Sequence, residues 1–343
     1  MARGDSPLRA AFRLIAQGAA TAATVAVLAG CPPRTAAPDP TSEIDQGEAK
    51  LERERLRARE AFAPMVAAHN ARVALLETFE APAATVLRYP DGDRVQEDQL
   101  DGFIYLATRG RGAFELRLLG KTWAWLGGDG ARSWIYFSPP NEPSRLHVYE
   151  RLVDGARADA TEVVGTAELT LLTPVSLRFL LGLAPIASDW SVVEAAPAPA
   201  GGAGSMFERF EVSWSPTPAT VARARLGADG MPGRVVVCDL AGNEIARATL
   251  SEFERVQRPD LAIGAWPRTA TKVVIEAPRS KASARLAIDR DALVRRTPRA
   301  RDEFFNLDDL QLYLAPTEVV YHDANGAARP NPAAPAPAPQ KGP

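Results

Sequence analysis

The pattern of hydrophobic and polar positions divides the chain into a helical beginning and a long β-rich body. Residues 48–62 are rich in Glu, Arg and Ala, which predicts a solvent-exposed helix of mixed charge. Pro64 interrupts that pattern, and apolar residues recurring every three or four positions predict a second helix from Pro64 to about Thr78. His69 lies on the apolar face of this helix, which favours a satisfied core histidine over a ligand.

From Val86 onward the hydrophobic period changes to two. Short β-prone segments separated by tight turns predict a first run of strands between Val86 and Tyr149. A second run is predicted between Phe207 and Ile288. The fold class is therefore α+β and mostly β, with one curved antiparallel sheet of about ten to twelve strands. The whole domain is expected to span residues 48–322.

An apolar segment separates the two runs of strands. Thr173 and Pro174 are typical of a helix start, and Gly182 is typical of a helix end. The helix is apolar on most sides, so it is either buried or covers something apolar. The low-complexity loop 196–205 is interpreted as an insertion at a strand end, and the Ala/Pro-rich residues 323–343 as a disordered tail.

The first thirty residues have the parts of a secretory signal. Three arginines precede a weakly apolar run, Leu14–Ala29, which is shorter than the ~20 residues that span a bilayer. Residues 1–30 are therefore predicted to be a signal peptide rather than a lasting transmembrane helix. Residues 31–47, rich in proline and acidic residues, are predicted to be a flexible tether.

The end of this segment resembles the lipobox of bacterial lipoproteins. The resemblance implies that signal peptidase recognises Leu28, Ala29 and Gly30 and that Cys31 is the site of lipid attachment. Acyl chains contribute about 0.8 kcal/mol for each buried CH₂, so two or three of them hold a protein at the membrane. The chain is then expected to face the periplasm. Pro32 stands where lipoproteins of the inner membrane carry Asp, so the resemblance favours the outer membrane.

Charge and cysteine content exclude some functions. The formal net charge is −2, which gives no electrostatic reason to expect nucleic acid as a partner. Of the two cysteines, Cys238 ends an apolar run that starts at Val235 and is interpreted as a small buried hydrophobe. No cofactor is expected, and the chain is expected to be a monomer.

The order of elements and several local features resemble the LolA/LolB-like lipoprotein-carrier fold over roughly residues 60–318. The local features are Leu100-Asp101-Gly102, Gly128-Asp129-Gly130 before Trp134-Ile135-Tyr136, Pro174 before the apolar helix, and Val236-Val237-Cys238-Asp239-Leu240-Ala241-Gly242. The resemblance implies an incomplete β-barrel with an N-terminal helix and a helical lid over an apolar interior. It also implies binding of a lipid, an acyl chain or a lipidated protein between sheet and lid, in lipoprotein sorting or lipid transport.

Two sets of residues are candidates for that site. The candidate lining of one concave face consists of Phe103, Tyr105, Leu116, Leu118, Trp123, Trp125, Trp134 and Tyr136. The candidate lid consists of Leu177, Phe179, Leu180 and Leu181. Both sets would serve equally as an ordinary packed core, and the sequence leaves these alternatives open.

Motifs for catalysis are missing from the sequence. His69, His147 and His322 are far apart and lack partners at metal-ligand spacing, so no metal site is expected. No nucleophile elbow, phosphate loop or dinucleotide fingerprint is present. Asp308-Asp309 is interpreted as a helix start. We therefore expect a protein that is not an enzyme. The alternatives are a structural or sensing lipoprotein that binds another envelope protein, and a periplasmic hydrolase.

Overall fold

The computed structural model describes the body of the chain with several gaps. The described residues are 40–91, 93–107, 111–140, 142–150, 172, 174–195, 206–217, 220–295, 302–322 and 328–329. The signal peptide, the lipobox with Cys31 and the loop 196–205 lie outside them, so those predictions stay predictions. Residues Lys50–Pro343 form one compact unit, and the fold described below is that of this unit.

The N-terminal helix is one continuous element. Helix α1 spans Pro40–Leu75, so the break predicted at Pro64 is wrong, and the helix already begins inside the segment predicted to be a tether. Pro64 is exposed, whereas Phe62 and Met65 beside it are buried. Packing of these neighbours outweighs the backbone hydrogen bond that a proline removes. The helix is mostly exposed over residues 48–62, although Phe62 belongs to the core.

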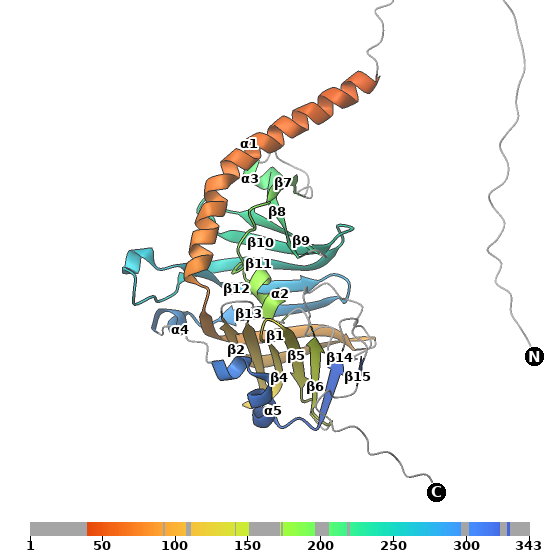
Figure 1. The fold of residues 1–343 in the computed structure, drawn as a ribbon, viewed down its shortest axis with the longest axis vertical. Helices are drawn as coiled ribbons and strands as arrows, with labels where there is room; N and C mark the ends of the chain where they lie inside the picture. The colour runs from red at the N-terminus through yellow and green to blue at the C-terminus, as the bar shows by residue number, and fades with distance from the viewer. Residues whose placement is uncertain are drawn as a thin grey trace, which may run out of the picture. The chain divides into compact units, whose positions relative to one another are not determined.

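The strands form one open sheet, which confirms the mostly β fold class. Its order is β15-β14-β6-β5-β4-β3-β2-β1-β13-β12-β11-β10-β9-β8-β7 (Figure 1). The bounds are β1 Phe79–Asp91, β2 Arg94–Leu106, β3 Gly112–Leu118, β4 Lys121–Gly128, β5 Arg132–Phe137, β6 Arg145–Glu150, β7 Ser191–Glu194, β8 Phe210–Thr217, β9 Thr220–Leu226, β10 Pro232–Asp239, β11 Glu244–Arg255, β12 Arg268–Ala277, β13 Ala282–Ile288, β14 Glu318–His322 and β15 Ala328–Arg329.

Two antiparallel meanders make up this sheet. Strands β1 to β6 form the first and β7 to β13 the second, and the pairing of β1 with β13 joins them. Both predicted runs of strands are therefore confirmed. The sequence reading missed the short strands β7, β14 and β15. Strand β15 lies within the segment predicted to be a disordered tail.

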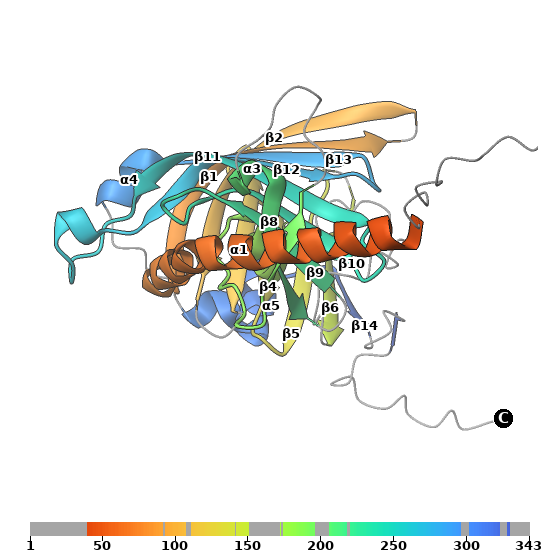
Figure 2. The same cartoon turned by 90° about the horizontal axis from the view of Figure 1, so that it is seen from above.

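The sheet curves around the short helix α2, Pro174–Leu180. This helix contacts β2, β3 and β4 of the first meander and also β10 of the second. Strands β4 and β10 would lie about 34 Å apart in a flat sheet, whereas a helix is about 10–12 Å wide. Only a curved sheet brings both strands to one helix. Figure 2 shows this arrangement, with β2 and β13 above and β4, β5 and β6 below.

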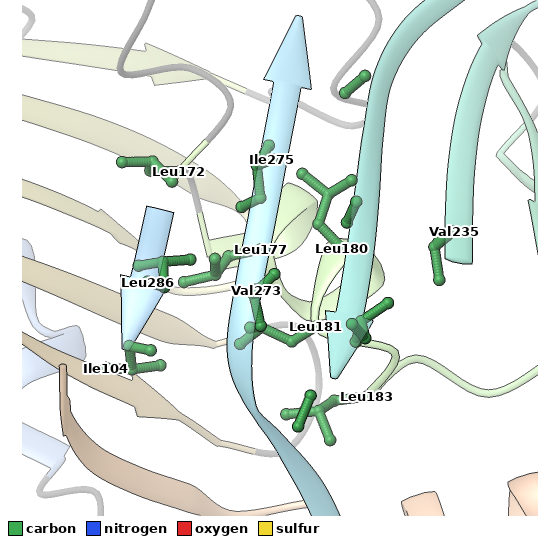
Figure 3. Close-up of a cluster of buried hydrophobic side chains, with 14 of the residues drawn as sticks. Ile104, Leu172, Leu177, Leu180, Leu181, Leu183, Val235, Val273, Ile275 and Leu286 are labelled. Carbon is green, nitrogen blue, oxygen red and sulfur yellow. The ribbon is translucent and has the colours of Figure 1, made fainter. Parts of the chain in front are cut away.

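Helix α2 and the turn after it fill the concave side of the sheet. Leu177, Leu180 and Leu181 are buried and lie among side chains from both meanders, including Ile104 and Val273 (Figure 3). The helix ends at Leu180, and Gly182, the predicted end, follows in the turn with a φ of +64° that suits glycine. A side chain there would also meet the ring of Pro232. Of the candidate lid residues, Phe179 is only partly buried against the same cluster.

His69 links α1 to the segment that follows α2. Its Nε2 lies 3.0 Å from the carbonyl oxygen of Ala184, and its Nδ1 lies 3.3 Å from the guanidinium of Arg72. A carbonyl only accepts and a guanidinium only donates, so the neutral ring with hydrogen on Nε2 satisfies both contacts. Burial lowers the pKa of His69 from 6.5 to about 4. The interpretation of His69 as a satisfied core histidine is confirmed.

The expectation that the histidines lie far apart is wrong for one pair. Strand β14 pairs in parallel with β6, which places Nδ1 of His147 3.0 Å from Nε2 of His322. Both rings are buried, and burial lowers the pKa of His147 to about 4. This pair attaches the C-terminal strand to the first meander. Among the described residues, no group of three His, Cys, Asp or Glu side chains is arranged to hold a metal ion.

Cys238 lies on β10 and is completely buried, as the sequence predicted. Burial raises the pKa of its thiol, so the residue acts as a small core side chain. Within the described part of the chain, no helix is both long and apolar enough to cross a membrane.

Replacing Leu177 by Ala tests the packing under the sheet. The Leu177→Ala change removes a fully buried side chain, and we expect the free energy of unfolding to fall by about 2–5 kcal/mol. Leu312→Ala is the matched control, because Leu312 is 83% exposed and its loss should change stability by less than about 0.5 kcal/mol. Urea denaturation measures both. Equal losses for the two variants would contradict the packed position of α2.

The low pKa of His69 predicts that stability falls in acid. In the unfolded chain His69 becomes protonated below about pH 6.5, whereas in the folded chain it becomes protonated only below about pH 4. Between these values the free energy of unfolding should fall by up to about 1.4 kcal/mol per pH unit from this residue. His69→Gln keeps a donor and an acceptor but does not titrate, so its urea stability should fall less steeply with pH. Carboxylates titrate in both proteins. If the urea stabilities of the original protein and the His69→Gln variant fall equally with pH, His69 is not protected from protonation in the folded chain.

Candidate functional site

The register of the first meander separates the candidate lining residues onto two faces of the sheet. Leu116, Leu118 and Trp123 face the core around α2. Phe103, Tyr105, Trp125, Trp134 and Tyr136 belong to a second apolar cluster on the opposite face. The prediction of one concave face is therefore wrong. Side chains alternate along a strand, and Trp123 lies beside an irregularity in the β3–β4 register, which breaks the simple alternation with Trp125.

A C-terminal segment covers the second face. It consists of the 3₁₀ helix η3, Asp302–Phe305, and helix α5, Leu307–Leu314. The side chain of Asn306 accepts hydrogen bonds from the backbone nitrogens of Asp308 (3.0 Å) and Asp309 (3.4 Å), which caps α5. The interpretation of Asp308-Asp309 as a helix start is confirmed. Phe305, Leu307 and Leu310 are buried against the sheet.

A cavity of about 580 Å³ lies between this cover and strands β2, β3 and β4. Its size is in the range of small-molecule sites, about 300–1,000 Å³. It is lined by Tyr105, Glu115, Arg117, Trp125, Glu303, Phe304, Asp309, Leu310 and Tyr313. We call it the α5 cavity. Of the eight residues proposed as lining, only Tyr105 and Trp125 belong to it.

Four aromatic rings shape the apolar part of the α5 cavity. The centroids of Tyr105 and Trp125 are 6.2 Å apart with nearly parallel planes, and Phe304 approaches Tyr105 to 4.5 Å. The ring of Tyr313 lies 6.3 Å from Trp125 at an angle of 66°. This wide angle makes Trp125 and Tyr313 neighbouring walls rather than a stacked pair. The side chain of Tyr313 is 66% exposed, which places it at the mouth of the cavity.

A buried carboxylate forms the polar wall. Glu115 is 1% exposed, and both its oxygens accept hydrogen bonds from Arg117 at 2.7 Å. The hydroxyl of Thr122 donates a third bond at 2.8 Å. This bidentate pairing raises the pKa of Arg117 above its ordinary value. The guanidinium also lies 5.3 Å from the ring centre of Phe103, so the ion pair is fixed against the aromatic cluster.

An indole donor and two further carboxylates also line the cavity. Nε1 of Trp125 is buried without a hydrogen-bond partner among the described residues. An orphaned buried donor costs free energy and is a reason to expect a missing acceptor. Glu303 and Asp309 are exposed on the cover, and in the described part of the chain neither carboxylate has an ion-pair partner.

The sequence contains one indication of this site, the alternating pattern of strand β3. Alternation of Glu115 and Arg117 with Phe114, Leu116 and Leu118 indicates a half-buried strand with one polar face. The structure covers that face with α5. Only the apolar stretch 304–314, which was expected to return to the body, pointed to such a cover.

Comparison with known proteins gives structural neighbours only. No family model matches the chain, and no curated protein matches it. Similar solved structures include a LolA superfamily protein from Nitrosomonas europaea, at 11% identity and a TM-score of 0.39, covering 70% of this chain and 96% of that one. A DUF1329 family protein from Desulfovibrio piger has 10% identity and a TM-score of 0.38, with 72% and 98% covered.

A third similar structure is an outer-membrane lipoprotein-sorting protein domain from Vibrio parahaemolyticus. It has 11% identity and a TM-score of 0.36, covering 65% of this chain and 89% of that one. These neighbours include the LolA-like class that the sequence features resemble. At such low scores the likeness carries no argument about function, which has to be drawn from the cavity itself.

Removing Arg117 tests whether the buried carboxylate depends on it. In Arg117→Met the Glu115 carboxylate loses two charged donors while staying buried, so stability should fall by about 3 kcal/mol. The control is Arg145→Met, whose partner Glu318 is exposed, with an expected loss below about 1 kcal/mol. Adding Glu115→Gln to the Arg117 variant should recover part of the loss. A double-mutant cycle with no coupling energy, measured by urea denaturation, would disprove the pairing.

Proposed function

We propose that the protein is a membrane-anchored envelope lipoprotein that binds an amphiphilic ligand in the α5 cavity and catalyses no reaction. The ligand class of the sequence-based hypothesis, a lipid, acyl chain or lipidated protein, is retained. The proposed binding site lies under α5, whereas the sequence-based hypothesis placed it under α2. The observation that carries the proposal is the 580 Å³ cavity with aromatic walls and an ion pair between buried Glu115 and half-buried Arg117.

The composition of the cavity walls supports binding of a molecule with both apolar and polar parts. Aromatic rings provide large apolar area at little cost in side-chain entropy, and a few fixed polar groups orient a ligand. On the α2 side, by contrast, the described leucines are buried against both meanders. Within the described part of the chain, the α5 cavity offers existing space for such a ligand.

The anchor is the part of the proposal that rests on sequence alone. Lipid attachment at Cys31 would hold the chain on the periplasmic side of the envelope, with the outer membrane favoured. A binding module tethered there could receive ligands from the membrane or from soluble carriers. This would suit a role in lipoprotein sorting or lipid transport.

Uptake of the neutral fluorescent probe N-phenyl-1-naphthylamine tests the proposed site. We would use the full chain with Cys31→Ser, which removes the acylation site and leaves every described residue unchanged. The probe should bind at one site with enhanced fluorescence. Tyr313→Ala should weaken binding about threefold to tenfold, because it removes one cavity wall. Leu312→Ala, the neighbouring exposed residue that does not line the cavity, should leave binding unchanged.

Three results would count against the proposal. Absence of probe binding would favour the alternative of a structural or sensing lipoprotein, in which the aromatic residues serve as packed core. Equal effects of the Tyr313 and Leu312 variants would place the probe elsewhere. Weakening by Leu177→Ala without weakening by Tyr313→Ala would return the site to the α2 side.

A further inference from the structure

We infer that the α5 cavity recognises a positively charged organic group, an ammonium or quaternary amine that also carries an oxygen acceptor. This inference rests on the proposed function and adds the chemical class of the ligand. It follows from three features of the cavity: its aromatic walls, its balance of charge, and its unsatisfied indole donor.

The aromatic walls suit a cation. The face of an aromatic ring attracts a positive charge that lies within about 6 Å of the ring centre. Among aromatic side chains, the ring of Trp attracts a cation most strongly. The cavity is lined by Trp125, Tyr105, Tyr313 and Phe304. Trp125 and Tyr313 lie edge to face at 66° with their centroids 6.3 Å apart, and the exposed ring of Tyr313 offers its surface at the mouth of the cavity. Recognition of quaternary ammonium groups by such aromatic sites is a general use of this interaction.

The charges that line the cavity are also suited to a cation. Among the described lining residues the only cation is Arg117, which is paired with the two oxygens of Glu115. The two further charged groups, Glu303 and Asp309, are both acidic. The walls therefore carry a net negative charge, and an anionic head group such as a carboxylate would be repelled. Opposite charge near a low-dielectric pocket raises the local concentration of a cationic ligand.

The orphaned donor points to a second feature of the ligand. Trp125 is 1% exposed and lines the cavity, and its Nε1 hydrogen has no acceptor among the described residues. A hydroxyl or ester oxygen placed next to the cationic group would accept this hydrogen. An indole nitrogen donates only, so the partner must be an acceptor.

Choline and 3,3-dimethyl-1-butanol provide a matched pair of probes. They have the same shape and the same hydroxyl, and differ in a positive nitrogen against a neutral carbon. The full chain with Cys31→Ser would be titrated with each, following the ¹H–¹⁵N signal of the Trp125 indole, assigned with Trp125→Phe. We expect choline to bind at least about tenfold more tightly and to shift this signal.

Neighbouring acidic residues provide a control for charge. Asp309→Asn should weaken choline about threefold and leave the neutral alcohol unchanged, because Asp309 lines the cavity. Asp308→Asn removes the same charge from the same helix turn but from a residue outside the lining, and should have a smaller effect. Dodecyltrimethylammonium, kept below its micelle concentration, identifies the source of the cation. Tighter binding of dodecyltrimethylammonium than of choline indicates an amphiphilic ligand. Equal binding of the two indicates a small free amine, and either result supports the inference.

The outcomes separate this inference from the proposed function. Equal binding of choline and the neutral alcohol, or tighter binding of dodecanoate than of dodecyltrimethylammonium, would overturn the inference while leaving the cavity as a binding site. Uptake of N-phenyl-1-naphthylamine without any response to choline would do the same. If neither probe binds, both proposals fail.

Discussion

The antiparallel pairing of β1 with β13 is the contact on which the rest of the structure depends. Strand β1 pairs with β2 along its whole length and with β13 from Ala83 to Arg88, so it belongs to both meanders at once. This pairing turns two separate meanders into one sheet. Curvature then follows, because both halves bury their apolar positions on the same short helix α2.

The site forms on the face of the curved sheet that points away from α2. Every second residue of β2, β3 and β4 is used on the α2 side, so the alternate residues face away from it. On that second face lie the aromatic side chains Tyr105 and Trp125 and the ion pair of Glu115 with Arg117. Helix α5 covers the aromatic part but does not fill the space above the ion pair, and a cavity remains.

Much of the fold could be predicted from local patterns. Period-two alternation identified the strands of both meanders, and Gly182 marked the end of α2. These features depend on residues close together in the sequence. Pro64 misled the reading of α1, because tertiary packing of its neighbours outweighs the local preference of proline.

The candidate site was only partly predictable. The aromatic residues were grouped as the lining of one concave face, but their division between two faces depends on the exact register of strands. A single irregularity beside Trp123 changes which side chains share a face. The pairing of His147 with His322 and the placing of Tyr313 against Trp125 join residues far apart in the chain. No local pattern carries that information.

The most direct test of the central claim is to locate a bound ligand by nuclear Overhauser effects. Spectra of the Cys31→Ser chain with bound N-phenyl-1-naphthylamine would be searched for contacts between probe and protein protons. We predict contacts with the rings of Tyr105 and Tyr313. Contacts with the methyl groups of Leu177 and Leu180, under the concave side of the sheet, would contradict the assignment of the site to the α5 cavity.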